Sequence, residues 1–448
     1  MFDFEHLKTH PGQVNDMEWY FIVVLGMLCF APLIANAFSK KKLAFWAPIT
    51  MFSVVMIYYA IVGPIKSIWD NDTNLRNIDH RPYFIYAWAG ALLFALCFIV
   101  AYYATPAKIC RPIELNMNKF KKQIWICFGI GLGSFVVLKG FWGLASVQFW
   151  EAQTEGSEAL FNAGSFNAYL GNAFNFLIVS APGFVYLYRK KKLGIIVFGV
   201  VMFLIVGLTI SMGFRWRLVI MGFACLSAWY FSRNRKVKII PLGLLCIGFL
   251  VLMGIMEQSR SYGSGLDITR LEGQSLEGNL EYSLSESATF QASGLVMFHT
   301  GTLFPTVGMS PVIQSLVSPI PRKLWPKKTT GEHLKYIEKV YMRPNSGNAG
   351  NGQAILGYGE YYMMYKWWGI VMMALFMGWF FAKTGKFSKD QTLTEVHPWL
   401  FIFKVLTTAY LYVVISRGYT PQQFMFYFFT VFPAWYFYKR SLKHDASH

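Results

Sequence analysis

Apolar residues are gathered into eleven runs along this chain, and most of these runs approach the length that crosses a bilayer. A helix needs about 20 mostly apolar residues to cross roughly 30 Å of hydrocarbon. The runs therefore predict an all-α polytopic membrane protein with about 11 transmembrane helices. The predicted spans are 18–38, 43–63, 84–105, 123–143, 166–188, 193–211, 217–232, 239–257, 363–382, 398–416 and 423–438.

A long hydrophilic segment, about 258–353, separates the eighth span from the ninth. It divides the chain into a membrane domain at 1–257, one large loop at 258–362 and a second membrane domain at 363–448. Residues 311–326 are apolar but broken by prolines, which predicts an interfacial or re-entrant element instead of a span.

Two short helices are predicted inside the loop. Thr329 and Glu332 form a capping-box pattern that begins the second of them. The first is an amphipathic helix, predicted by helical spacing of Ala288, Ala292, Leu295, Val296 and His299.

Composition and charge support a membrane protein and give its orientation. The chain is 55% hydrophobic and only 14% charged, which does not suit a water-soluble domain. Its net charge is +18, and six stretches that follow alternate spans hold 22 Lys and Arg against four acids. The positive-inside rule makes that side cytoplasmic, so the N-terminus is outside and the C-terminus inside. The net charge therefore reflects the membrane topology and does not indicate a surface that binds nucleic acid.

Several chemistries lack a sequence signal. The six cysteines lie in spans or in an inner loop, and no Cys or His spacing indicates zinc. A phosphate-binding P-loop and a serine nucleophile elbow are also absent from the sequence. We therefore expect no metal or other cofactor and no nucleotide-dependent mechanism.

Arginines at the outer ends of spans are the first candidate constellation. Guanidinium groups bind phosphate oxygens in a bidentate manner and stay charged at the membrane boundary, although such residues also anchor span ends by snorkelling. The group comprises Arg215, Arg217, Arg260, Arg322 and Arg417.

Lysines within spans and proton-transfer groups complete the candidates. Lys139 and Lys404 are intramembrane cations, which often mark a site, and Lys404 can instead snorkel inward. A glycosyl transfer to a hydroxyl needs a general base, for which carboxylates and imidazoles are suited. The candidates for that role are Glu332, Glu360, His299 and His333.

One segment of the long loop has the sequence Ser318-Pro-Ile-Pro-Arg-Lys-Leu-Trp-Pro326. This segment resembles the outer-loop I-P-x-x-L-W-P stretch of O-antigen and related oligosaccharide repeat-unit polymerases of the Wzy type. The span pattern and the single large late loop are also similar. Further similar features are Gly213-Phe-Arg215, Gly357-Tyr-Gly-Glu-Tyr-Tyr, Trp367-Trp-Gly369 and Ser416-Arg-Gly418. Tyr419 stands where an acidic residue is common in that family, which leaves Arg417 as the transferable part of the last turn.

The resemblance implies a GT-C-like glycosyltransferase of the bacterial inner membrane. Such an enzyme moves a growing glycan from undecaprenyl pyrophosphate to a lipid-linked repeat unit at the periplasmic face, and works beside a flippase and a chain-length regulator. The implied catalytic residues are Glu360, His299 and Arg215. The implied substrate-binding residues are Arg217, Arg260, Arg322, Lys323, Arg417, Lys139, Trp325 and Tyr361.

Two other readings fit the same sequence. An O-antigen ligase shares the architecture and the donor lipid but uses a lipid A-core acceptor. A transporter or lipid-glycan flippase would carry polar groups deep in several spans and often repeated halves. Spans 1, 2, 3, 6 and 8 are almost wholly apolar here, and no repeat is visible.

Overall fold

The fold of the chain is given by a computed structural model. The structure describes residues 13–39, 41–75, 78–107, 115–139, 166–211, 215–233, 288–317, 354–388 and 396–445, with short pieces between 235 and 266 and between 320 and 340. In this part of the chain, seven helical segments are long and apolar enough to cross a membrane. They are Asp16–Phe38, Pro48–Trp69, Arg81–Ala104, Met117–Val137, Tyr169–Arg189, Gly357–Gly385 and Pro398–Ser416.

These seven segments coincide with predicted spans 1 to 5, 9 and 10. The sixth span is a shorter apolar helix, the seventh is a helix that begins with two arginines, and the eleventh is divided at Val431. The eighth predicted span lies mostly outside the described residues.

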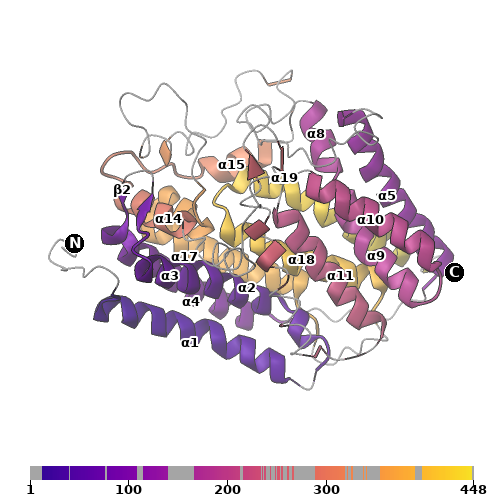
Figure 1. Ribbon diagram of the computed structural model, residues 1–448, viewed down its shortest axis with the longest axis horizontal. Helices are drawn as coiled ribbons and strands as arrows, with labels where there is room; N and C mark the ends of the chain where they lie inside the picture. The colour runs from indigo at the N-terminus through magenta and orange to yellow at the C-terminus, as the bar shows by residue number, and fades with distance from the viewer. Residues whose placement is uncertain are drawn as a thin grey trace.

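The helices and strands follow one another along the chain as shown in Figure 1. The longer helices are α1 (Asp16–Phe38), α2 (Pro48–Ile57), α4 (Phe84–Ala104), α5 (Met117–Lys139), α9 (Phe176–Arg189), α10 (Ile195–Ser211), α11 (Arg215–Ser232), α17 (Gly357–Gly385) and α18 (Pro398–Ser416). The shorter ones are α3 (Gly63–Trp69), α8 (Phe166–Ala173), α14 (Ala288–His299), α15 (Ser310–Val317), α19 (Thr420–Thr430) and α20 (Phe432–Asp445). Strands β1 (Asn74–Leu75) and β2 (Ile78–Asp79) pair antiparallel, as do β3 (Arg260–Ser261) and β4 (Gly265–Leu266).

Local sequence explains where several helices begin. Asn15 caps α1, and Glu18 accepts a hydrogen bond from the Asn15 backbone nitrogen at 2.8 Å, which completes a capping box. Proline occupies the first turn of α2, α18 and α19, where its missing N–H costs no helical hydrogen bond. In these four helices the first turn is therefore favoured by a capping box or by a proline.

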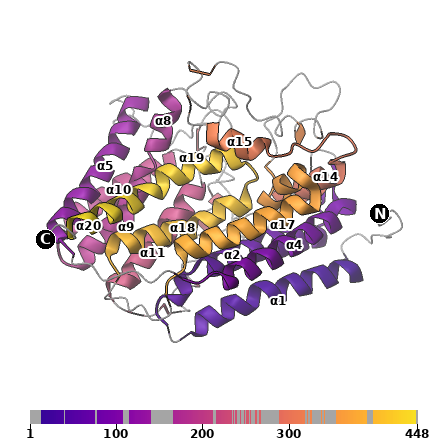
Figure 2. The same cartoon turned by 180° about the vertical axis from the view of Figure 1, so that it is seen from behind.

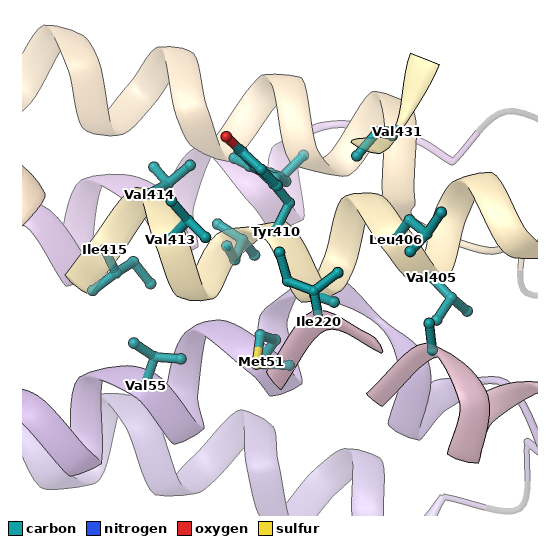
Figure 3. Close-up of a cluster of buried hydrophobic side chains, with 14 of the residues drawn as sticks. Met51, Val55, Ile220, Val405, Leu406, Tyr410, Val413, Val414, Ile415 and Val431 are labelled. Carbon is teal, nitrogen blue, oxygen red and sulfur yellow. The ribbon is translucent and has the colours of Figure 1, made fainter. Parts of the chain in front are cut away.

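Helix α18 forms the centre of the bundle. All of its residues except Tyr412 are buried, and it packs against α2, α9, α11, α17, α19 and α20. Figure 3 shows Tyr410, Val413 and Val414 of α18 beside Met51 of α2 and Ile220 of α11. In contrast, α1 and α10 lie at the periphery and expose large apolar side chains such as Met27 and Phe203, as expected for lipid-facing helices.

The two ends of the bundle differ in charge. Helix α1 begins and α20 ends at opposite ends of the helical body, as Figures 1 and 2 show. The acidic side chains that the structure describes lie where α1, α4 and α17 begin, on Asp16, Glu18, Asp70, Asp72, Asp79 and Glu360. At the other end, Lys386 donates hydrogen bonds to the Tyr102 and Thr105 carbonyl oxygens (3.2 and 3.0 Å), which stabilises the end of α4. We call these the acidic end and the basic end.

Helix α14 differs from the sequence prediction in its surroundings. A helix over these residues was expected and is present, but Phe290 to Met297 are all buried, so it is not a surface amphipathic helix. It packs against α4 and α17, and the small residues Ser293 and Gly294 allow the close approach. Part of the predicted loop therefore belongs to the helical body.

Helix α17 also differs, because it begins six residues before the predicted span and contains a break. Tyr365 and Lys366 leave helical geometry, and Lys366 has a positive φ of 53°. The backbone nitrogens of Val307 and Gly308 donate to the carbonyl oxygens of Met363 and Met364 (2.9 and 3.1 Å). Carbonyls exposed by the break are thus satisfied by the segment after α14.

Candidate functional site

Hydrogen bonds to backbone and side-chain groups hold the turn between α18 and α19 in place. We define the Arg417 turn as residues 416–420. The Arg417 nitrogen donates to the Val413 carbonyl oxygen at 3.1 Å, and the Gly418 nitrogen donates to that of Ile355 at 2.6 Å. Gln423 donates a side-chain hydrogen bond to the Arg417 carbonyl oxygen. A Cβ on Gly418 would lie 3.1 Å from the Glu360 Cβ, so glycine permits the close contact with α17.

Glu360 joins the first turn of α17 to the start of α19. Its side chain is fully buried, and its Oε2 accepts a hydrogen bond from Thr420 Oγ1 at 2.7 Å. The Thr420 backbone nitrogen lies 3.1 and 3.0 Å from the two carboxylate oxygens. A carboxylate at a helix N-terminus satisfies an otherwise unpaired N–H and interacts favourably with the helix dipole. Glu360 therefore caps α19 from another helix and fixes the Arg417 turn.

Two buried tyrosines flank Glu360 on α17. Tyr358 and Tyr361 are fully enclosed, and their ring centroids lie 6.3 and 6.0 Å from that of Phe94 on α4. Tyr361 is one of the substrate-binding candidates from the sequence, but its enclosed ring offers no face to a ligand. Tyr361 instead packs α17 against α4 beside Glu360.

The arginines at the start of α11 form a second group. Arg217 is 3% exposed, and its Nε donates to Asn175 Oδ1 at 2.9 Å. Its guanidinium also lies over the rings of Phe174 and Trp216, 5.3 and 5.1 Å from their centroids. Arg215, the first residue of α11, is half-buried.

The start of α11 contacts α19, which is the helix that follows the Arg417 turn. Trp216 stacks on Phe426 of α19 with ring centroids 4.6 Å apart. Phe426 is six residues into α19 from Thr420, about 9 Å along its axis. The start of α11, which carries Arg215 and Arg217, therefore contacts the same helix whose first turn follows Arg417.

His299 occupies the end of α14. Its ring contacts, within the described part of the chain, are with Tyr83 and Phe298, at centroid distances of 6.0 and 5.1 Å. Partial burial lowers the pKa of His299, so its imidazole is neutral near pH 7. The structure does not bring His299 into contact with the described residues of the Arg417 turn.

The other sequence candidates have different outcomes. Lys404 is buried at the basic end and donates to the Lys386 carbonyl oxygen at 2.7 Å, which agrees with the expected inward snorkelling. Trp325 is 46% exposed. Arg260 lies in β3 and Lys139 ends α5, but the structure does not describe their side chains. The remaining candidates, Arg322, Lys323, Glu332 and His333, lie outside the described residues.

Sequence reasoning missed the partners of the two key side chains. Thr420 precedes a proline that opens a helix, which was a usable signal for an N-terminus in need of a cap. Asn175 is a polar residue inside an apolar run, which was a signal for a buried hydrogen bond. Neither signal names the partner, because Glu360 and Arg217 lie far away in sequence.

Comparison with known proteins gives no relative. No protein-family model, no curated protein and no solved structure matches this chain. The fold and its apolar helices establish the class: an all-α, multi-pass membrane protein.

Proposed function

We propose that this chain is a polysaccharide polymerase, a glycosyltransferase that works at the outer face of a bacterial inner membrane. A hydroxyl oxygen on the acceptor repeat unit attacks the anomeric carbon of the donor glycan. The bond from that carbon to the pyrophosphate oxygen breaks, undecaprenyl pyrophosphate leaves, and the hydroxyl proton passes to a base. In this proposal the chain crosses the membrane eleven times, starts outside and ends inside, so that the acidic end of the bundle faces the periplasm.

The observation that carries this proposal is the fixed Arg417 turn at the start of α19, the helix that the start of α11 contacts. Two helix N-termini and three arginines lie on α11, α19 and the turn before α19, and the ring contact between Trp216 and Phe426 joins the two helices. Helix N-termini and guanidinium groups both favour phosphate oxygens. A pyrophosphate that gains charge as the glycosidic bond breaks would be stabilised by such a set of donors.

The geometry supports a different role for each of Arg417, Glu360 and His299. Arg417 follows α18 on a turn whose backbone is fixed, which is the arrangement a charge-stabilising side chain needs. Glu360 is fully buried and its oxygens are engaged by Thr420, which supports a positioning role over the general-base role expected from the sequence. Among the described candidates, His299 is the neutral, half-buried group suited to proton transfer.

Buried charge in the described helices supports a site at the membrane boundary. Glu18, Arg81, Arg217 and Glu360 lie in or next to the first turns of their helices, and Lys404 lies two turns into α18. A transporter path would require such groups near the middle of several spans. The ligase alternative uses the same donor chemistry, so only the product separates it from the polymerase.

Gene deletion in the host, followed by gel analysis of the surface glycolipid, tests the proposal. A polymerase deletion leaves lipid core with a single repeat unit and no ladder. Core without any repeat would support the ligase or flippase alternative, and an unchanged ladder together with unchanged capsule and exopolysaccharide would refute the proposal.

Complementation with variants then tests the site. Arg417→Ala is expected to lower polymer yield at least about 100-fold, the size of effect typical for one charge-stabilising donor. Arg417→Lys keeps the charge but loses bidentate geometry, so it should restore only part of the ladder. Arg440→Ala, at the basic end, is the matched control and should support a normal ladder at equal protein level.

A further inference from the structure

Two arginines share one indole ring at the basic end of the bundle. The Arg189 guanidinium carbon, at the end of α9, lies 4.3 Å from the Trp229 ring centroid. The Arg233 guanidinium carbon, just after α11, lies 4.9 Å from the same centroid. Helices α9 and α11 pack along each other, so this arrangement follows from the fold.

The charge of this pair is not neutralised by acidic groups in the described chain. The ion pairs found there are Lys66–Asp70 and Arg81–Glu18, both at the acidic end. Arg189 Nε is buried and has no hydrogen-bond partner among the described residues. An indole attracts each cation, but it supplies no counter-charge for two of them. The pair therefore has the electrostatic character of an anion site.

The surroundings favour a lipid over a free anion. Lys190 and Lys192 follow Arg189 and are exposed, and α10 begins immediately after them with exposed Ile195 and Ile196. Tyr188 stacks on Phe198 with centroids 4.3 Å apart, which holds α10 against the end of α9. A basic cluster beside an exposed apolar helix suits a molecule with a phosphate and acyl chains, whereas a free phosphate would have no use for the apolar face.

We propose that Arg189, Arg233 and Trp229 form a binding site for the phosphate of an anionic phospholipid in the inner leaflet. The two guanidinium groups bind the phosphate oxygens, and the acyl chains run along the exposed face of α10. Guanidinium is the side-chain group best matched to phosphate, and tryptophan is enriched at headgroup depth. Basic pockets between helices on the cytoplasmic side are suited to such headgroups. This site lies at the opposite end of the bundle from the Arg417 turn and does not depend on the proposed polymerase activity.

Lipid binding to the purified full-length protein tests the proposal directly. Native mass spectrometry would count retained lipid during titration with phosphatidylglycerol or phosphatidylcholine. The wild-type chain is expected to retain phosphatidylglycerol selectively. Arg189→Gln with Arg233→Gln removes two phosphate contacts and should weaken that binding about 30-fold, since each basic residue near an anionic surface contributes roughly fivefold.

A matched double variant separates a built site from diffuse attraction. Lys41→Gln with Lys383→Gln removes two exposed charges from the same end of the bundle, next to the ends of α1 and α17 instead of α9 and α11, and should weaken binding less than about threefold. Equal weakening by both double variants would overturn the proposal in favour of general surface charge. Competition by millimolar inorganic phosphate at the Arg189 pair would instead identify a free-phosphate site. Thermal unfolding in phosphatidylcholine verifies that both variants remain folded.

Discussion

Thr420 connects a buried carboxylate to the start of α19 through two donors, and this connection can be tested without any assay of activity. Thr420→Val keeps the side-chain shape but removes the Oγ1 donor that lies 2.7 Å from Glu360. A lost hydrogen bond to a buried charged group costs about 1.5–3 kcal/mol. We expect a lower midpoint of thermal unfolding in detergent, together with loss of the proposed polymerisation because the Arg417 turn loosens.

The Glu360→Gln variant distinguishes a positioning role of Glu360 from a role in proton transfer. The amide keeps one oxygen acceptor for Thr420 but cannot act as a base. If Glu360 positions the turn, Glu360→Gln should retain more than about a tenth of the polymer yield, whereas Glu360→Ala should lose it. A Glu360→Gln protein with wild-type stability and no polymer would favour the base role instead.

His80 gives a prediction for pH dependence. Its ring is buried beside the start of α4, with Nδ1 2.7 Å from the Ile78 carbonyl oxygen. Burial lowers the pKa of His80, and hydrogen bonds to Ile78 and the charge of Asp79 offset this only in part. The unfolded chain therefore takes up the proton first as the pH falls. Stability from neutral His80 is fully present above about pH 6.5 and is lost as the pH falls towards the lower folded-state pKa.

The corresponding measurement compares thermal unfolding at pH 7.5 and pH 5.5. The midpoint of the wild-type protein should fall more between these values than that of His80→Gln, which does not titrate. Identical changes in the two proteins would mean that His80 does not contribute to the pH dependence.

At the residue scale, sequence reasoning found several members of the site but not its contacts. The sequence indicated Arg417 as a site residue because of its charge at a span end. It indicated Glu360 because this carboxylate lies beside a predicted span. Their junction depends on a contact between α17 and α19, which are separated by a whole helix, α18. Sequence periodicity reports the face of one helix and carries no information on which helix it meets.

Helix α15 buries polar side chains and exposes apolar ones. Gln314 and Ser315 are each 4% exposed, whereas Ile313 and Leu316 are 56% and 64% exposed. The buried polar groups are satisfied within the helix, since Gln314 donates to Ser310 Oγ at 2.9 Å and Ser315 donates to the Pro311 carbonyl oxygen at 2.7 Å. Exposed isoleucine and leucine would be unfavourable in water. We therefore expect α15 to lie in lipid with one edge on α19.

Spin labels on α15 measure this directly. Labels at Ile313→Cys and Leu316→Cys, in a cysteine-free background in bilayers, should collide more often with oxygen than with a water-soluble nickel reagent. Asp72→Cys, at an exposed turn near the same end of the bundle, is the aqueous control and should show the reverse preference. A nickel preference at both α15 positions would place this helix in water.

The elements themselves were largely predictable, because hydrocarbon-spanning helices need long apolar runs and the sequence displays those runs. The sequence did not show that α14 is enclosed or that α17 breaks at Lys366. Both depend on tertiary contacts: α14 is buried by α4 and α17, and the break is satisfied by backbone donors of Val307 and Gly308. A short helix in a hydrophilic segment therefore resembles a surface element until its neighbours are known.

For the whole molecule, the separation of charge between the two ends of the bundle predicts its orientation in the membrane. The described acidic side chains gather at the end where α1 begins, and the basic residues at the ends of α9, α11 and α17 lie at the other. Basic segments resist translocation, so the basic end should remain in the cytoplasm. Because α1 begins and α20 ends at opposite ends of the body, we expect an odd number of membrane crossings between them.

Reporter fusions test this orientation and, with it, the side on which the Arg417 turn lies. Alkaline phosphatase folds only outside the cytoplasm, where its disulfides form, and green fluorescent protein exported through the same route does not become fluorescent. Fusion after Lys439 or Lys192 should therefore give fluorescence without phosphatase activity, and fusion after Asp72 should give phosphatase activity without fluorescence. The reverse result at all three positions would place Arg417 and Glu360 in the cytoplasm. A lipid-linked repeat unit at the outer face could not then reach the Arg417 turn, and the proposed polymerase would be excluded even if the fold were correct in every contact.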